Sequence, residues 1–135
     1  MSPSDNNLGL YVHIPFCHRR CHFCAFYLEI ARPDPMARFH SALIQEIALH
    51  RRQDSLNGRA LQSIYFGGGT PTSLPADQLA ALLTLIQATW PTSPTTEITV
   101  EAHPTSVTER DLTVLADAGF NRISLGAESM APQDL

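Results

Sequence analysis

The sequence has no lysine and no long apolar run, and its small net charge is negative. All nine basic residues are arginine, so no side-chain amine is available to form a Schiff base with a carbonyl substrate. No apolar run approaches the roughly 18 residues that a membrane-spanning helix needs, so we expect no membrane span. The formal net charge of −4 at pH 7 argues against a general nucleic-acid-binding protein.

Cysteine is also scarce, and the three cysteines present form one group. Cys17, Cys21 and Cys24 have the spacing C-x3-C-x2-C, and their odd number excludes complete pairing as disulfides. A cubane 4Fe–4S cluster normally takes four thiolate ligands. Three ligands leave one iron with an open position, which is where a metal centre can do chemistry. The spacing therefore predicts a 4Fe–4S cluster with one iron open to a further ligand.

Two other interpretations of the cysteines remain. A zinc ion could take His18 or His22 as its fourth ligand, although structural zinc sites more often use a second cysteine or histidine pair, which this chain lacks. The thiols could also be unconnected and inert. Reduced cysteines at metal-binding spacing fit a cytoplasmic protein.

The length of 135 residues, with 44% hydrophobic and 16% charged residues, fits one folded domain. Residues 1–7 are polar and lack the charged and apolar regions of a signal peptide, so we expect a short tail there. Residues 8–135 then form the domain. We expect Pro33 and Pro35 to interrupt the chain between the cysteine loop and the first helix.

Apolar periodicity predicts alternating strands and helices in the order β-α-β-α-β-α-β, which is typical of a parallel sheet. Four strands cannot close an eight-stranded barrel, so we expect the leading part of a larger open or partial barrel. Thr108 with Asp111 predicts a helix N-terminus, and Gly119 the end of that helix. The expected strands cover 8–15, 63–66, 97–101 and 122–125, and the expected helices end near residues 52, 90 and 119.

The unusual residues follow the predicted strands one by one. The cysteine loop follows the first strand, Gly67–Gly69 the second, Glu101 ends the third and Glu128 follows the fourth. Because the carboxyl ends of parallel strands share one edge, we expect these groups to face a common space, where ligands bind in such folds.

Each of these groups also has a simpler interpretation. The three glycines allow a ligand to approach the backbone closely, or they form a tight turn. Glu101 accepts hydrogen bonds from ribose hydroxyls, or it is a solvated carboxylate. Tyr11 is either a polar residue of a barrel interior or a packing aromatic, and Phe23 would shield a cluster from water.

Four segments resemble one known family. Tyr11–Cys17 with the cysteine spacing, Phe66–Thr72, Glu101–Pro104 and Arg122–Ser129 resemble motifs of the oxygen-independent coproporphyrinogen III oxidase family, which includes radical S-adenosylmethionine (SAM) heme chaperones of the HemW type. The chain departs from these motifs at His103, where the family has Asn, and at Glu128, where it has Gln.

The resemblance implies a TIM-like partial (β/α)6 radical SAM barrel, cut here after its fourth strand. It also implies that Cys17, Cys21 and Cys24 hold the cluster, that SAM chelates the open iron, and that cleavage of SAM gives a 5′-deoxyadenosyl radical. The residues that would contact SAM are Tyr11, Phe23, Gly68, Gly69, Thr70, Glu101 and Glu128.

The residue type at the position of Phe26 distinguishes two functions within the family. The oxidases carry a further cysteine two residues after the third, whereas the chaperones carry phenylalanine, as here. The resemblance therefore implies a protein that binds heme and transfers it to an acceptor protein. The alternatives are an oxidase that decarboxylates porphyrinogen propionates and a structural metal protein without SAM chemistry.

Overall fold

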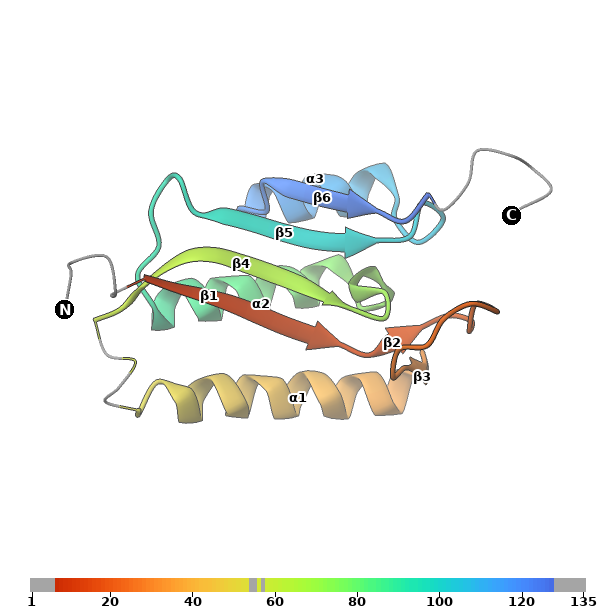
Figure 1. Ribbon diagram of the computed structural model, residues 1–135, viewed down its shortest axis with the longest axis horizontal. Coiled ribbons are helices and arrows are strands. Elements are labelled where there is room, and N and C mark those ends of the chain that lie inside the picture. The colour runs from red at the N-terminus through yellow and green to blue at the C-terminus, as the bar shows by residue number, and fades with distance from the viewer. Residues whose placement is uncertain (1–6, 54–55, 57, 128–135) are drawn as a thin grey trace.

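The computed structural model describes residues 7–53, 56 and 58–127, and its centre is a four-stranded sheet (Figure 1). The strands lie in the order β1-β4-β5-β6, and every neighbouring pair is parallel, which confirms the predicted parallel α/β fold. Each predicted strand is present within a few residues of its expected bounds. The bounds are Asn7–Ile14 for β1, Ala60–Gly68 for β4, Glu97–Ala102 for β5 and Arg122–Leu125 for β6.

Three helices connect the strands, and α2 contacts both α1 and α3. Figure 1 shows α2 and α3 behind the sheet, with α1 running below β1 in that view. A single 3₁₀ turn, η3, precedes α2 among the described residues that follow β4. The bounds are Pro33–His50 for α1, Pro71–Ser73 for η3, Ala76–Thr89 for α2 and Glu109–Ala118 for α3.

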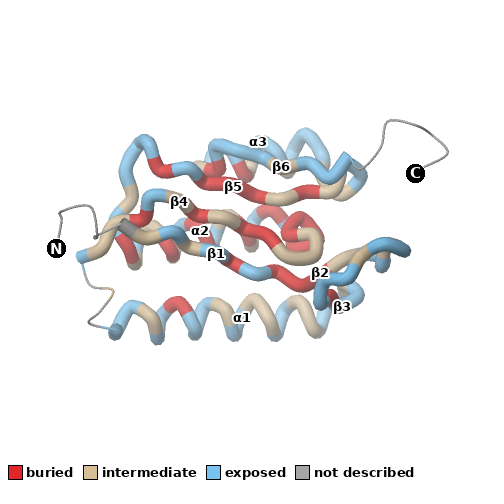
Figure 2. The backbone as a smooth tube through the Cα atoms, in the orientation of Figure 1, coloured by how far each residue is buried: buried red, intermediate tan, exposed pale blue. Residues whose placement is uncertain are grey.

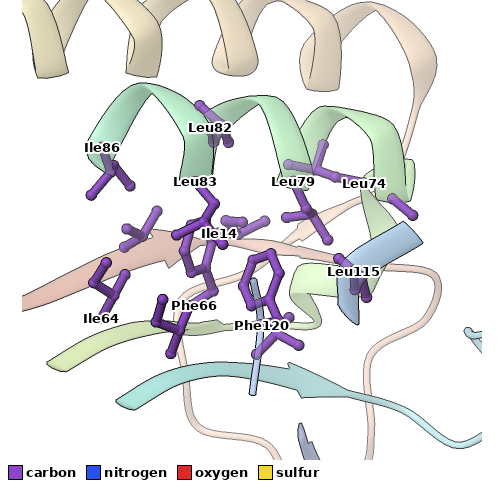
Figure 3. Close-up of a cluster of buried hydrophobic side chains, with 14 of the residues drawn as sticks. Ile14, Ile64, Phe66, Leu74, Leu79, Leu82, Leu83, Ile86, Leu115 and Phe120 are labelled. Atoms are coloured by element: carbon purple, nitrogen blue, oxygen red, sulfur yellow. The ribbon is translucent and has the colours of Figure 1, made fainter. Parts of the chain in front are cut away.

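The core lies between the sheet and the helices. Alternate residues of β1, β4 and β5 are buried on this side, among them Ile14, Ile64, Phe66 and Val100, whereas Ile123 and Leu125 of β6 stay exposed. Figure 3 shows how α2 turns its apolar side chains toward these strand residues, and Figure 2 shows the buried segments gathered along β4, β5 and α2. The apolar stripe of α2 consists of Leu79, Leu82, Leu83 and Ile86, all with no exposed surface. This burial fixes the register of the sheet, because a shift by one residue would expose the core side chains.

The opposite face of the sheet is polar. The register places Tyr11 of β1 beside Tyr65 of β4, and Glu101 of β5 beside Ser124 of β6. Because side chains alternate along a strand, these residues point away from the buried face that holds Ile64 and its neighbours. The fold therefore presents a polar surface that leads to the carboxyl ends of the strands.

The structure corrects three details of the sequence prediction. Pro33 and Pro35 do not interrupt the chain but lie in the first turn of α1, where a missing N–H leaves no helical hydrogen bond unmade. Strand β4 includes Gly67 and Gly68, which were expected to follow it. A second, two-residue parallel pair, β2 (Phe16–Cys17) with β3 (Glu29–Ile30), was not predicted.

The start of α3 gives a stability prediction. Thr108 accepts a hydrogen bond from the Asp111 N–H, and the Asp111 carboxylate accepts from the Thr108 N–H and hydroxyl, so the predicted capping pair is confirmed. Thr108→Ala should lower the free energy of unfolding by about 1 kcal/mol in urea denaturation. Thr113→Ala is the matched control, because Thr113 is an exposed helical threonine of α3, and it should change stability much less. Equal losses in the two variants would contradict the capping role.

The same pair predicts a pH dependence. The hydrogen bonds from Thr108 hold the pKa of Asp111 below its ordinary value. A group with a lowered folded pKa contributes stability above its unfolded pKa and loses that contribution as pH falls. The difference between wild type and Thr108→Ala should therefore shrink when urea denaturation is repeated below about pH 4, near the ordinary pKa of aspartate.

Candidate metal centre

A cavity of about 430 Å³ opens at the carboxyl ends of the strands. Strands β4, β5 and β6 and the residues just beyond their carboxyl ends form one part of its wall, and residues 17–28, which follow β1, form the other part. The lining residues are Cys17, Arg19, Cys21, Phe23, Cys24, Ala25, Phe26, Leu28, Gly68, Gly69, Thr70, Glu101, Ala102, His103, Ser124, Leu125 and Gly126. The predicted convergence on one space is therefore present for the cysteine loop, the glycine segment and Glu101, while Glu128 lies outside the described residues.

The short pair β2–β3 holds the two ends of the cysteine loop together. The Glu29 N–H donates to the Pro15 carbonyl at 2.7 Å, and the Ala31 N–H donates to the Cys17 carbonyl at 2.9 Å. Cys17 therefore lies on a fixed strand, whereas Cys21 and Cys24 lie on the loop, joined by a turn in which the Cys24 N–H donates to the Cys21 carbonyl at 3.2 Å. One cysteine is thus anchored to the fold while the other two belong to the loop that it starts.

The glycine segment packs directly against this anchored cysteine. The Thr70 N–H donates to the Phe16 carbonyl at 2.7 Å, and the Thr70 hydroxyl lies 3.5 Å from the Cys17 sulfur. A Cβ atom on Gly69 would lie 2.7 Å from the Phe16 oxygen and 2.9 Å from the Cys17 sulfur, which is too close. Gly69 is therefore required by the packing of the cysteine strand, in addition to any role toward a ligand.

The three thiols share the wall of one cavity. All three are free and half-buried. Among residues 7–53, 56 and 58–127, no three His, Cys, Asp or Glu side chains are close enough together to hold one metal ion. In a cubane each thiolate binds a different iron. The ligand sulfurs therefore lie around the cluster and do not converge on one metal atom. His18 and His22 are exposed and lie outside the cavity wall, which gives no support to a zinc site using them.

Glu101 is held by two donors. The Tyr65 hydroxyl donates to one carboxylate oxygen at 2.6 Å, and the Gly68 N–H donates to the other at 3.3 Å. The hydrogen bond to Glu101 is the main cause that raises the pKa of Tyr65 above its ordinary value, with burial and the Glu101 charge adding to it. Tyr11 stacks on the Tyr65 ring with 6.0 Å between ring centres. Burial and the Glu101 charge raise the pKa of Tyr11 as well.

The residues predicted to contact SAM divide into three groups. Five of them line the cavity: Phe23, Gly68, Gly69, Thr70 and Glu101. Tyr11 does not line it, since its ring lies further back on the sheet against Tyr65 and its hydroxyl is 3.2 Å from His13 Nδ1. Glu128 lies outside the described residues. Phe23 lies on the wall but is 71% exposed.

Sequence reasoning did not single out Tyr65, Arg19 or Ser124 as site residues. Tyr65 could have been found, because it alternates with the buried Phe66 and so shares the face of the sheet that carries Glu101. Ser124 lies beside Glu101 in the register and lines the cavity. Arg19 lies in the loop, where no periodicity shows which side chains face inward.

These features define a class of protein. A parallel β/α sheet carries a three-cysteine loop beyond its first strand and a glycine segment at the end of the second, and both face one open cavity. Such a site can hold a metal cluster together with a small ligand. Comparison with family models agrees, since residues 11–133 match the radical SAM superfamily, and the chain belongs to that superfamily.

Known proteins with similar sequences carry several names. The chain is 37% identical to anaerobilin synthase from Escherichia coli O157:H7, over 89% of this chain and 27% of that protein. It is 35% identical to oxygen-independent coproporphyrinogen III oxidase from Cereibacter sphaeroides, over 96% of this chain and 29% of that protein. It is 38% identical to heme chaperone HemW from Bacillus subtilis, over 88% of this chain and 31% of that protein.

A solved structure has the same fold. The coproporphyrinogen III oxidase HemN from Escherichia coli, described as a radical SAM enzyme, matches with a TM-score of 0.81 and 32% identity, over 93% of this chain and 29% of that chain. This likeness confirms the predicted TIM-like fold and places the chain at its N-terminal part. The chain thus spans less than a third of the length of these relatives.

Membership in the superfamily implies a 4Fe–4S cluster and SAM. The residues present fit these groups, because three free thiols and an acceptor carboxylate line one cavity together with Gly68 and Gly69 of the glycine segment. Of the helices that the structure describes, none has the length and apolar character to cross a membrane.

The contact between Thr70 and Cys17 predicts an effect on the redox potential. Hydrogen bonds to cluster sulfur ligands favour the reduced, more negative state. Thr70→Val should therefore lower the midpoint potential of the reconstituted cluster in a redox titration without SAM, and Thr70→Ser should retain it. Thr72→Val is the matched control, because the Thr72 hydroxyl pairs with Ser106 at 2.6 Å, not with a cysteine. An unchanged potential in Thr70→Val would show that the hydroxyl does not act on the cluster.

Proposed function

We propose that this chain forms the cluster-binding and SAM-binding part of a heme chaperone, a radical SAM protein of the HemW type that binds heme and transfers it to an acceptor protein. The observation that carries this choice is Phe26. It occupies the position where the oxidases of the family have a further cysteine, and its ring lines the cavity with 73% of its surface exposed. A thiol can donate a hydrogen atom or a proton, whereas a phenyl ring can only pack, stack or exclude water.

In this proposal the side chains have separate roles. Cys17, Cys21 and Cys24 ligate the cluster, and Thr70 supports Cys17 through its hydroxyl. Glu101 accepts hydrogen bonds from the SAM ribose, and Gly68 and Gly69 let the backbone approach the ligand closely. When bound, the cluster supplies the electron for reductive cleavage of SAM. The protein orients the groups and excludes water from them.

The second candidate is an oxygen-independent coproporphyrinogen III oxidase. Relatives of that name match at identities close to those of the chaperones, and the similar solved structure is such an oxidase. An oxidase would need a site for the porphyrinogen propionates, and Arg19 on the cavity wall offers one guanidinium for a carboxylate. Phe26 is the observation against this candidate.

The proposed ligands and location follow from the chaperone function. The whole protein would bind SAM and heme, would meet a heme-acceptor protein, and would act in the cytoplasm, where thiols stay reduced.

One assay separates the two functions. The whole protein, with its cluster reconstituted anaerobically, is given SAM, a reductant and coproporphyrinogen III, and products are separated by chromatography. A family member of established oxidase activity serves as the positive control. We expect no protoporphyrinogen IX, together with saturable heme binding in a visible absorption titration. Turnover of coproporphyrinogen III would overturn the chaperone proposal and favour the oxidase.

A further inference from the structure

Tyr65 donates the shortest of the hydrogen bonds to Glu101, yet Tyr65 does not line the cavity. The hydroxyl lies 2.6 Å from Glu101 Oε1, and the bond joins two neighbouring strands, β4 and β5. Glu101 itself lines the cavity. Tyr65 therefore contacts Glu101, a proposed ligand-binding residue, without lining the cavity itself.

The two hydrogen bonds to Glu101 leave some of the acceptor sites of its carboxylate free for a ligand. A carboxylate has about four lone-pair sites for hydrogen bonds. The Tyr65 hydroxyl uses one site on Oε1, and the Gly68 N–H uses one site on Oε2. One site on each oxygen remains, which matches the two adjacent hydroxyls of a ribose. Because both oxygens are held, the carboxylate cannot rotate without breaking one of these bonds.

We propose that Tyr65 is a positioning residue, whose hydroxyl fixes the Glu101 carboxylate so that its two free acceptor sites meet the ribose hydroxyls of SAM. The inference rests on the proposed function, in which Glu101 receives the ribose. It adds a residue that acts through Glu101 and does not touch the ligand.

The surroundings of Tyr65 support this role. Its ring stacks on Tyr11 with an angle of 21° between the planes, which limits movement of the ring. Ser124 of β6 lies beside Glu101 in the register, so polar side chains of three neighbouring strands share this face. The Tyr65 hydroxyl makes the hydrogen bond to Glu101 while the ring does the packing, so Tyr65→Phe removes the bond and keeps the ring.

The test compares two ligands by calorimetric titration of the whole reconstituted protein. One ligand is SAM, and the other is its analogue that lacks the ribose 2′-hydroxyl. Tyr65→Phe should weaken SAM binding about tenfold, the size expected for one hydrogen bond to a charged group, and should weaken binding of the analogue much less. In the double variant with Glu101→Gln, Tyr65→Phe should cause little further loss. A purely structural role would weaken both ligands equally.

Tyr27→Phe is the matched control, because the Tyr27 hydroxyl also donates to a glutamate carboxylate, that of Glu29 at 2.9 Å, and neither residue lines the cavity. It should leave both affinities within about twofold of wild type, well below the tenfold effect of a lost charged hydrogen bond. Two failures are distinguishable. If Glu101→Gln weakens SAM binding but Tyr65→Phe does not, the positioning role is wrong and the Glu101 contact stands. If Glu101→Gln itself leaves SAM binding unchanged, both the ribose contact and the positioning role are wrong.

Discussion

Replacing Cys17, Cys21 or Cys24 with alanine should abolish the cluster. Anaerobic reconstitution of the wild-type protein should give about four iron and four sulfide per chain, the composition of a cubane, and each variant should lose nearly all of both. Each variant should be equally severe, because the three cysteines of this sequence line one cavity and each would bind a different iron. Chemical analysis of iron and sulfide, with the visible absorption of the cluster, measures this directly.

His18→Ala and His22→Ala are the controls for the cysteine variants. Both histidines flank the cysteines and are exposed, and they are the residues that a zinc site would recruit. They should keep the full iron and sulfide content. Retained cluster in any cysteine variant, or its loss in a histidine variant, would contradict the assignment of the ligands.

Gly68→Ala should have the second large effect, on both stability and cluster content. Gly68 has φ 122°, a conformation that residues with a side chain rarely adopt, and a Cβ atom there would lie 2.7 Å from the Ile14 carbonyl oxygen. The combined strain and clash should lower the free energy of unfolding by about 3 kcal/mol. Because Gly68 pairs with Ile14 at the end of β1, the cysteine loop that follows should also move, and reconstitution should yield less cluster.

Gly58→Ala separates backbone strain from the clash. Gly58 also has a positive φ, 73°, but a Cβ atom there would meet nothing within 4 Å. Its replacement should cost about 1 kcal/mol in urea denaturation and leave the cluster content unchanged. Equal effects of the two glycine variants on stability and cluster content would mean that the contact between β4 and Ile14 does not support the site.

Periodic segments of the fold could be predicted, and short or irregular ones could not. The alternation of Val12 and Ile14 with polar neighbours and the stripe of Leu79, Leu82 and Leu83 each extend over several residues, so burial imposes a readable pattern. The β2–β3 pair has two residues on each side, too few for any period, and its partners are brought together only by the tertiary fold. The start of α1 was misjudged because proline in a first helical turn and proline in a chain break have the same sequence signature.

Some residues of the site could likewise be predicted from the sequence, and others could not. The cysteines, Gly68, Gly69, Thr70 and Glu101 could be placed at one edge, because each follows or ends a predicted parallel strand. The contact of Tyr65 with Glu101 depends on the lateral register of β4 and β5, which no local pattern contains. The hydrogen bonds that hold the ends of the cysteine loop come from the backbone N–H groups of Glu29 and Ala31, and every residue type except proline carries such a group.

The central claim is that the three cysteines hold a cluster whose open iron takes SAM. Electron paramagnetic resonance of the reduced, reconstituted whole protein tests it, with SAM that carries nitrogen-15 in its amino group. We expect a cluster signal that changes when SAM is added, together with a magnetic coupling between the cluster and the labelled nitrogen. A cluster signal that is identical with and without SAM and shows no such coupling would contradict it.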